Sequence, residues 1–147
     1  MSGFLDTSIV VRYLTGDPPE LAEQAARIID GVDDLLITDV VLTETAYVLM
    51  SVYQVRREVT VDHLIAFLQK ENISPFALDK SLVLHALLLC RPSGRVSFAD
   101  AMVWAAARSA SNKAVYSLDE RFPMSDWKFA KRFKRSEMQY LVIACFN

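Results

Sequence analysis

The sequence predicts an α/β fold with a central, mostly parallel sheet of four to five strands and helices on both faces. The first observation is that short apolar runs alternate with stretches of helical periodicity along most of the chain. The second is composition: 52% apolar and 23% charged residues, with four Gly and five Pro, exclude disordered and collagen-like classes. The 147 residues fit a single domain, residues 1–147, with no repeat or linker.

The first thirty residues predict a strand followed by two helices. Phe4 and Leu5 form a short apolar run that ends at Asp6. Apolar residues then recur at helical spacing until Gly16, which ends the pattern. Pro19 suits the first turn of a second helix. The apolar stripe of that helix, ahead of Gly31, consists of Leu21, Ala25, Ile28 and Ile29.

The rest of the chain continues the alternation. Thr60 is expected to cap a helix that runs through Glu71, and Ser97 to cap a helix that runs to about Ser111. Asp100 would then lie at the third position of its helix, where a carboxylate favours the positive end of the helix dipole. The other expected elements are a strand at 35–38, a helix at about 40–53, a strand or extended connector at 73–78, a helix at 80–90 and strands at 114–117 and 140–146. The last of these either joins the sheet edge or pairs with another chain.

The charge distribution excludes a protein that coats nucleic acid by charge alone, because the formal net charge is −2. A local basic patch nevertheless lies between residues 121 and 135. The candidate RNA contacts in this patch are Arg121, Lys128, Lys131 and Arg132. The alternative is a solvated surface face. The sequence does not assign the Arg56-Arg57 pair to substrate, partner or water.

Compartment and redox state are also constrained by the sequence. The longest apolar run, residues 82–90, is well short of the roughly 20 residues that span a bilayer, so we expect no membrane association. The N-terminus lacks the pattern of a secretory signal, which favours a cytoplasmic protein. Cys90 and Cys145 lie in apolar surroundings without metal-binding spacing, so we interpret both as buried free thiols.

Four carboxylates stand among apolar residues and are therefore expected to be at least partly buried: Asp6, Glu44, Asp100 and Asp119. Asp6 and Asp119 each follow an expected strand, and ligands of parallel sheets bind at the carboxyl ends of strands. Asp100, at the start of its helix, and Glu44 can reach the same edge. The alternative is that Asp6 and Asp100 are helix caps and that hydrogen bonds satisfy the other two.

Clustered carboxylates repel one another unless a cation compensates their charge. An all-oxygen ligand set suits Mg²⁺ or Mn²⁺ better than zinc, which prefers His and Cys. Such a metal activates water and neutralises charge on a phosphodiester, and a second ion roughly 4 Å away stabilises the leaving oxygen. The chemistry implied is phosphodiester hydrolysis.

Four segments resemble the PIN-domain ribonucleases, and in particular the VapC toxins of bacterial toxin–antitoxin pairs. The segment that begins Phe4-Leu5-Asp6-Thr7-Ser8 and ends Gly16-Asp17 is similar to the opening of that family, with Ser8 in place of its more frequent Asn. The others are Thr43-Glu44 with Tyr47-Val48-Leu49, Ser97-Phe98-Ala99-Asp100-Ala101 and Ser117-Leu118-Asp119-Glu120-Arg121-Phe122. The resemblance covers about residues 4–122, and residues 123–147 fit it poorly.

The resemblance implies a three-layer PIN fold with an acidic Mg²⁺ or Mn²⁺ site. Asp6 and Asp100 are implied as direct metal ligands, with Glu44 and Asp119 acting partly through water. It further implies that Ser117 orients Asp119 or a bound water and that Thr7 bonds the acid cluster, although each hydroxyl is alternatively a cap. It also implies an RNA substrate, a homodimer and a small VapB-like antitoxin that blocks the site.

Several functions compete with a metal-dependent toxin ribonuclease. A housekeeping PIN nuclease of RNA processing would share the site, and a non-catalytic RNA-binding or interaction module would share the fold. Phosphoryl transfer with Asp6 as the nucleophile is disfavoured, because Asp-Thr-Ser lacks the second aspartate of an Asp-x-Asp arrangement. The chain contains no P-loop, dinucleotide fingerprint or HExxH motif. Four aromatic side chains are given structural rather than catalytic roles: His63, His85, Trp104 and Trp127.

Overall fold

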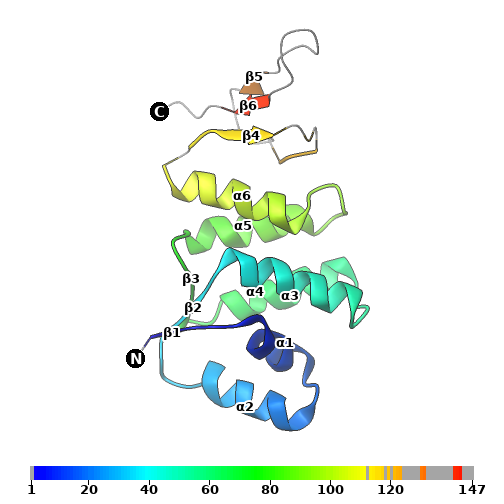
Figure 1. Ribbon diagram of the computed structural model, residues 1–147, viewed down its shortest axis with the longest axis vertical. Helices are drawn as coiled ribbons and strands as arrows, with labels where there is room; N and C mark the ends of the chain where they lie inside the picture. The colour runs from blue at the N-terminus through cyan, green and yellow to red at the C-terminus, as the bar shows by residue number, and fades with distance from the viewer. Residues whose placement is uncertain are drawn as a thin grey trace. The chain divides into compact units, whose positions relative to one another are not determined.

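The structure is a computed structural model of the 147-residue chain. It describes residues 2–111, 113–117, 119, 121–123, 130–131 and 141–143, with backbone alone in the last two ranges. The chain divides into two compact units, Met1–Phe76 and Ala77–Asn147, whose elements are labelled in Figure 1. Among the described residues, no helix combines the length and apolar character needed to cross a membrane.

The first unit contains a parallel sheet with the strand order β1-β2-β3. Its elements, in chain order, are β1 (Gly3–Phe4), α1 (Thr7–Thr15), α2 (Pro19–Ile29), β2 (Leu35–Ile37), α3 (Asp39–Ser51), α4 (Arg57–Leu68) and β3 (Ile73–Pro75). Leu35 of β2 pairs with Gly3 on one side and with Ile73 on the other. Parallel pairing requires a crossover between successive strands, and helices supply both crossovers.

Local sequence explains where α1 begins and ends and where α2 begins. The Asp6 side chain caps α1, and Gly16 ends it in the left-handed conformation (φ 71°), which glycine adopts without a steric penalty. The Gly16 N–H donates to the Arg12 carbonyl at 2.9 Å. Pro19 is the first residue of α2, where its missing N–H costs no helical hydrogen bond.

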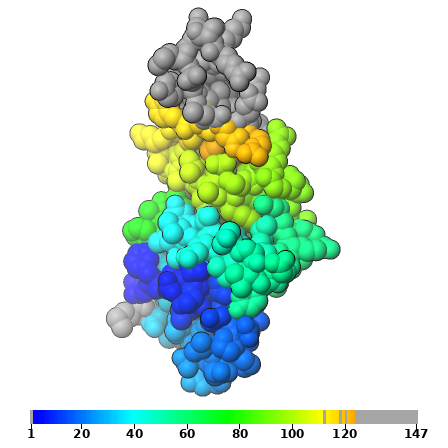
Figure 2. Space-filling view, turned by 45° about the vertical axis from the view of Figure 1, so that its right-hand side comes forward, coloured from blue at the N-terminus to red at the C-terminus, as the bar shows by residue number. Residues whose placement is uncertain are grey.

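The core of the first unit lies between the sheet strands and the helices. Figure 2 shows the dark-blue N-terminal segment against the cyan surface of the β2–α3 region, which agrees with the pairing of β1 with β2. The largest side chains that are fully buried in this unit are Phe67, Ile29, Ile37, Leu42, Leu64, Leu68, Ile73, Val10 and Val61. Burial of these side chains is the main term that stabilises the unit.

The second unit consists of two packed helices and a small antiparallel sheet. Its described elements are α5 (Lys80–Cys90), α6 (Phe98–Ser109), β4 (Val115–Ser117), β5 (Ala130–Lys131) and β6 (Leu141–Ile143). Asp79 caps α5 and Ser97 caps α6, each by accepting a backbone N–H of the first turn. Trp104 of α6 is 1% exposed, and its ring contacts His85 of α5. The strand order of the sheet is β4-β6-β5.

The α/β class with a mostly parallel sheet and flanking helices is confirmed. Among the described residues the parallel sheet has three strands, fewer than the four to five expected, and β4 pairs with β6 in an antiparallel sheet. The expectation that Thr60 caps α4 is wrong, because this helix begins at Arg57 and Thr60 is a buried residue within it. In the apolar stripe of α2, Ala25 and Ile29 are buried, whereas Leu21 and Ile28 are exposed.

Candidate active site

Asp6 lies at the junction of strand and helix in the first unit. Leu5 anchors the chain in the core, and the next residue caps α1. Its Oδ2 accepts the Ser8 backbone N–H at 3.1 Å and the Ser8 hydroxyl at 2.6 Å. These two hydrogen bonds stabilise the ionised form, the hydroxyl bond most, and lower the pKa of Asp6. Asp6 is therefore a carboxylate at neutral pH.

Glu44 is connected to the same turn of α1 through Thr7. Thr7 is buried, and its hydroxyl donates to Glu44 Oε2 at 2.6 Å across the α1–α3 contact. A bond of this length to an ionised acceptor is among the stronger hydrogen bonds in proteins. The first turn of α1 thus fixes two carboxylates, Asp6 through Ser8 and Glu44 through Thr7.

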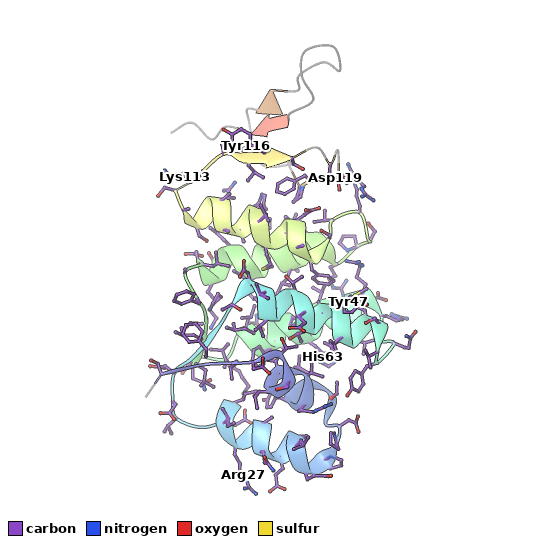
Figure 3. The ribbon with its side chains drawn as sticks, in the orientation of Figure 1. Arg27, Tyr47, His63, Lys113, Tyr116 and Asp119 are labelled. Atoms are coloured by element: carbon purple, nitrogen blue, oxygen red, sulfur yellow. The ribbon has the colours of Figure 1, made fainter. Side chains whose placement is uncertain are left out.

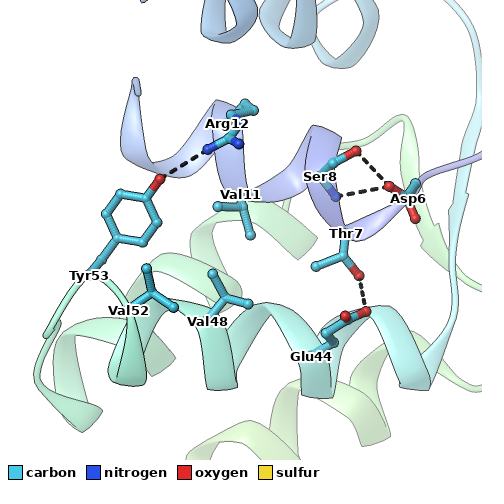
Figure 4. A pocket seen from close by; sticks show the side chains of 9 residues that line it. All are labelled: Asp6, Thr7, Ser8, Val11, Arg12, Glu44, Val48, Val52 and Tyr53. Carbon is cyan, nitrogen blue, oxygen red and sulfur yellow. Dashed lines mark hydrogen bonds between the residues drawn. The ribbon is translucent and has the colours of Figure 1, made fainter. Parts of the chain in front are cut away.

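Both carboxylates line one pocket between α1 and α3 (Figure 4). The pocket has a volume of about 380 Å³. Its acidic end is followed along the two helices by apolar side chains and then by an arginine and a tyrosine. The lining residues are Asp6, Thr7, Ser8, Val11, Arg12, Glu44, Val48, Val52 and Tyr53.

The second unit holds the other two candidate acids. Asp119 follows β4, on the segment labelled in Figure 3, and its backbone N–H donates to the Ser117 hydroxyl at 3.1 Å. Its carboxylate accepts two bonds from the Arg121 guanidinium, at 3.1 and 3.2 Å. This contact lowers the pKa of Asp119 and raises that of Arg121. The charge of Asp100 makes a further, smaller contribution to the raised pKa of Arg121.

Asp100 lies in the first turn of α6, as expected, and its backbone N–H donates to the Ser97 cap at 3.0 Å. The helix cap is therefore provided by Ser97, and the Asp100 carboxylate is not used for capping. The expectation that all four acids are at least partly buried is wrong for Asp6 and Glu44, which are exposed. Both are exposed because they lie at the pocket, whereas Asp100 and Asp119 are half-buried.

The structure thus presents two acidic pairs, one in each unit. Asp6 and Glu44 share a pocket, whereas Asp119 is paired with Arg121 and Asp100 contributes its charge to the raised pKa of that guanidinium. Within the parts of the chain that are described, no group of three or more His, Cys, Asp or Glu side chains is arranged to hold a metal ion. The meeting of the two pairs in one site stays a prediction of the sequence.

The donor chemistry of the first pair fits a hard divalent cation. Ionised carboxylates and neighbouring hydroxyl oxygens are ligands that Mg²⁺ and Mn²⁺ prefer, and no His or Cys lines the described pocket. His63 and His85 are exposed, and His85 contacts the Trp104 ring at 5.1 Å between centroids. Cys90 is a buried free thiol, as expected.

Sequence reasoning missed three residues of this pocket. Ser8 differs from the more frequent Asn of the family, but an Asp two residues before a Ser at a helix start is also a common capping pattern. No local pattern singles out Arg12 and Tyr53, because their contact joins residues 41 positions apart.

The expected basic patch is described only in part. Arg121 is paired with Asp119. Lys131 is described only as backbone, and three further residues lie outside the described residues: Lys128, Arg132 and Trp127. Cys145 also lies outside them.

The family of the chain follows from comparison with known sequences. The family model of the PIN domain matches residues 3–128, which include both acidic pairs. The chain therefore belongs to the PIN domain family. PIN domains are typically metal-dependent nucleases, which agrees with the oxygen-rich pocket. Searches of curated proteins and of solved structures find no match.

Proposed function

We propose that the protein is an endoribonuclease that hydrolyses RNA phosphodiester bonds with Mg²⁺ or Mn²⁺. The observation that carries the proposal is the pocket in which two carboxylates, Asp6 and Glu44, are each fixed by a hydroxyl of the first turn of α1. In this proposal, Asp100 and Asp119 complete the acidic site. Membership of the PIN domain family supports a nuclease.

Each side chain has a distinct role in this proposal. Ser8 keeps Asp6 ionised and aimed, and Thr7 fixes the rotamer of Glu44. Ser117 holds the backbone at Asp119, and Arg121 compensates its charge until a cation or RNA phosphate enters. When bound, a divalent cation supplies charge neutralisation at the phosphodiester and activation of water. Asp6 and Asp100 would hold it directly, with Glu44 and Asp119 in support.

Cleavage of total cellular RNA by the purified full chain tests this proposal. We expect discrete fragments with Mn²⁺, none with EDTA, and none from Asp6→Asn or Asp100→Asn. The matched control is Asp34→Asn, which removes an exposed carboxylate of the first unit outside the pocket. Wild-type and Asp100→Asn proteins that cleave alike would refute the acidic site. Metal binding by the wild type without cleavage would favour a non-catalytic module.

We further propose that the protein is the toxin of a VapBC-type pair, acts in the cytoplasm and forms a homodimer. The similarity of its acidic segments to VapC toxins supports this role. Expression should then arrest growth, and co-expression of the gene product encoded beside it, a small VapB-like antitoxin, should restore growth. A housekeeping nuclease would instead be tolerated when expressed alone. Light scattering on the purified chain tests the dimer.

A further inference from the structure

The pocket between α1 and α3 extends beyond its acidic end. Val11 and Arg12 lie five and six residues after Asp6, and Val48 and Val52 follow Glu44 at four-residue spacing along α3 and its C-cap. Because a helix rises 1.5 Å per residue, Arg12 lies about 9 Å along α1 from Asp6. The pocket is therefore acidic at one end, apolar in the middle and basic at the other end (Figure 4).

Arg12 is held in place by a hydrogen-bonded network. Its Nη1 donates to the Asp17 carbonyl at 3.0 Å and to the Tyr53 hydroxyl at 3.1 Å. The Tyr53 hydroxyl in turn donates to Asp17 Oδ2 at 3.2 Å. Tyr53 thus uses its hydroxyl both to accept and to donate, and it links the end of α3 to the loop after α1. A guanidinium fixed in this way loses little conformational entropy when it binds a ligand.

Only Nη1 of Arg12 is used by these bonds to described residues, whereas a guanidinium has five N–H groups. Of the described residues that line the pocket, Arg12 alone carries a positive charge. A phosphate group is repelled by Asp6 and Glu44 and attracted to Arg12, whose charge is partly offset by the Asp17 carboxylate of the same network. The intervening valines offer an apolar surface, on which Val52 is 66% exposed.

The size of the pocket limits what can enter it. A volume of about 380 Å³ is near the lower end of the roughly 300–1,000 Å³ typical of small-molecule sites. A pocket of this volume accommodates one nucleotide. Bases in an RNA duplex are stacked and paired, so only an unpaired nucleotide can be turned into a pocket of this kind.

We propose that this pocket binds a single unpaired nucleotide of RNA beside the phosphodiester that is cleaved. Arg12 binds the phosphate of that nucleotide, Val48 and Val52 pack against its base, and Tyr53 is a positioning residue for Arg12. The inference rests on the proposed ribonuclease function and adds a nucleotide subsite, formed by Arg12 and the valines of α3, to the acidic site.

The test measures binding and not cleavage. Fluorescence anisotropy in EDTA follows the affinity of the full chain for a labelled single-stranded RNA oligonucleotide and for the same sequence as a duplex. We expect tighter binding to the single strand. Arg12→Gln should weaken it at least about tenfold, because a charged hydrogen bond is lost. The slope of log affinity against log salt should fall by about 0.7, as for one lost contact with a single-stranded phosphate.

Further variants separate binding from folding. Tyr53→Phe keeps the ring and should weaken single-strand binding about two- to tenfold, and Arg12→Lys should recover part of the affinity lost in Arg12→Gln. The control is Arg27→Gln on α2, an exposed arginine paired with Glu23 and absent from the pocket. Circular dichroism checks that each variant is folded.

The outcomes distinguish this inference from the proposed function. Equal single-strand affinity in wild type, Arg12→Gln and Tyr53→Phe would overturn the nucleotide pocket, even if wild type cleaves RNA with Mn²⁺. Tighter binding to the duplex than to the single strand would also overturn it. Conversely, an affinity loss specific to Arg12→Gln in a protein that does not cleave would retain the pocket and refute the nuclease.

Discussion

Replacement of Thr7 by Val tests the connection between α1 and the Glu44 carboxylate. Valine has nearly the same shape but no hydroxyl, so the 2.6 Å hydrogen bond to Glu44 is lost while the packing of this buried side chain is retained. Hydrogen bonds to charged groups contribute about 1.5–3 kcal/mol to stability. Because Glu44 is exposed, water replaces part of this, and we expect a loss of about 1 kcal/mol in the free energy of unfolding.

The same change should reduce metal affinity. Glu44 without Thr7 samples more rotamers, and loss of a group that orients a metal ligand typically reduces affinity about tenfold or more. Urea unfolding followed by circular dichroism measures the first effect, and calorimetric titration with Mn²⁺ measures the second. The control is Thr43→Val on α3, whose hydroxyl donates to the Asp39 carbonyl of its own helix. If stability and Mn²⁺ affinity are unchanged in Thr7→Val, as in Thr43→Val, the Thr7–Glu44 hydrogen bond neither stabilises the fold nor orients Glu44.

Three further predictions concern the cap, the core and a surface ion pair. Ser8→Ala removes the main cause of the lowered pKa of Asp6, so Mn²⁺ binding should begin to weaken at a higher pH than in wild type as the solution is acidified. Mn²⁺ titrations across pH 3 to 7, roughly the range around an ordinary Asp pKa, measure this. The same pH dependence in Ser8→Ala and wild type would contradict it. Leu64→Ala, at a fully buried position of α4, should cost about 2–5 kcal/mol in urea unfolding, and a smaller loss would place Leu64 outside the core. Lys70 lowers the pKa of Asp30, so the pair stabilises the fold above the ordinary pKa of Asp and this contribution is lost as pH falls below it. Lys70→Met should therefore cost about 0.5 kcal/mol at pH 7 and nothing at pH 2, measured as the midpoint of urea unfolding at each pH; equal losses at both would exclude the ion pair as the cause.

Local signals made much of the fold predictable. Pro19 at the start of α2 and Gly16 at the end of α1 act through their own backbone conformations. The Ser97 cap involves only Ser97 and the N–H three residues later. The expected Thr60 cap was wrong because threonine, a common capping residue, also occurs inside helices, and in α4 it is buried in the second turn. Pairing of β4 with β6 joins residues 115 and 143, and no local pattern specifies which strand a distant segment selects.

The candidate site shows the same division. Asp6 was identifiable because a lone carboxylate directly follows an apolar run, and its cap geometry is set within three residues. The Thr7–Glu44 bond spans 37 positions and the Arg12–Tyr53 bond 41, so both depend on how α1 packs against α3. Exposure of Glu44 could not be inferred either, because the apolar residues Val40 and Tyr47, which share its helix face, are themselves exposed, at 67% and 69%.

In the proposed function, Asp6 of the first unit and Asp100 of the second hold the same metal ion. Calorimetric titration of Mn²⁺ into wild type, Asp6→Asn and Asp100→Asn checks this proposal, with Asp34→Asn as the control. We expect each of the two site variants to bind Mn²⁺ much more weakly than wild type, although the two residues belong to different units. Wild-type affinity in Asp100→Asn, with lost affinity in Asp6→Asn alone, would overturn the shared site.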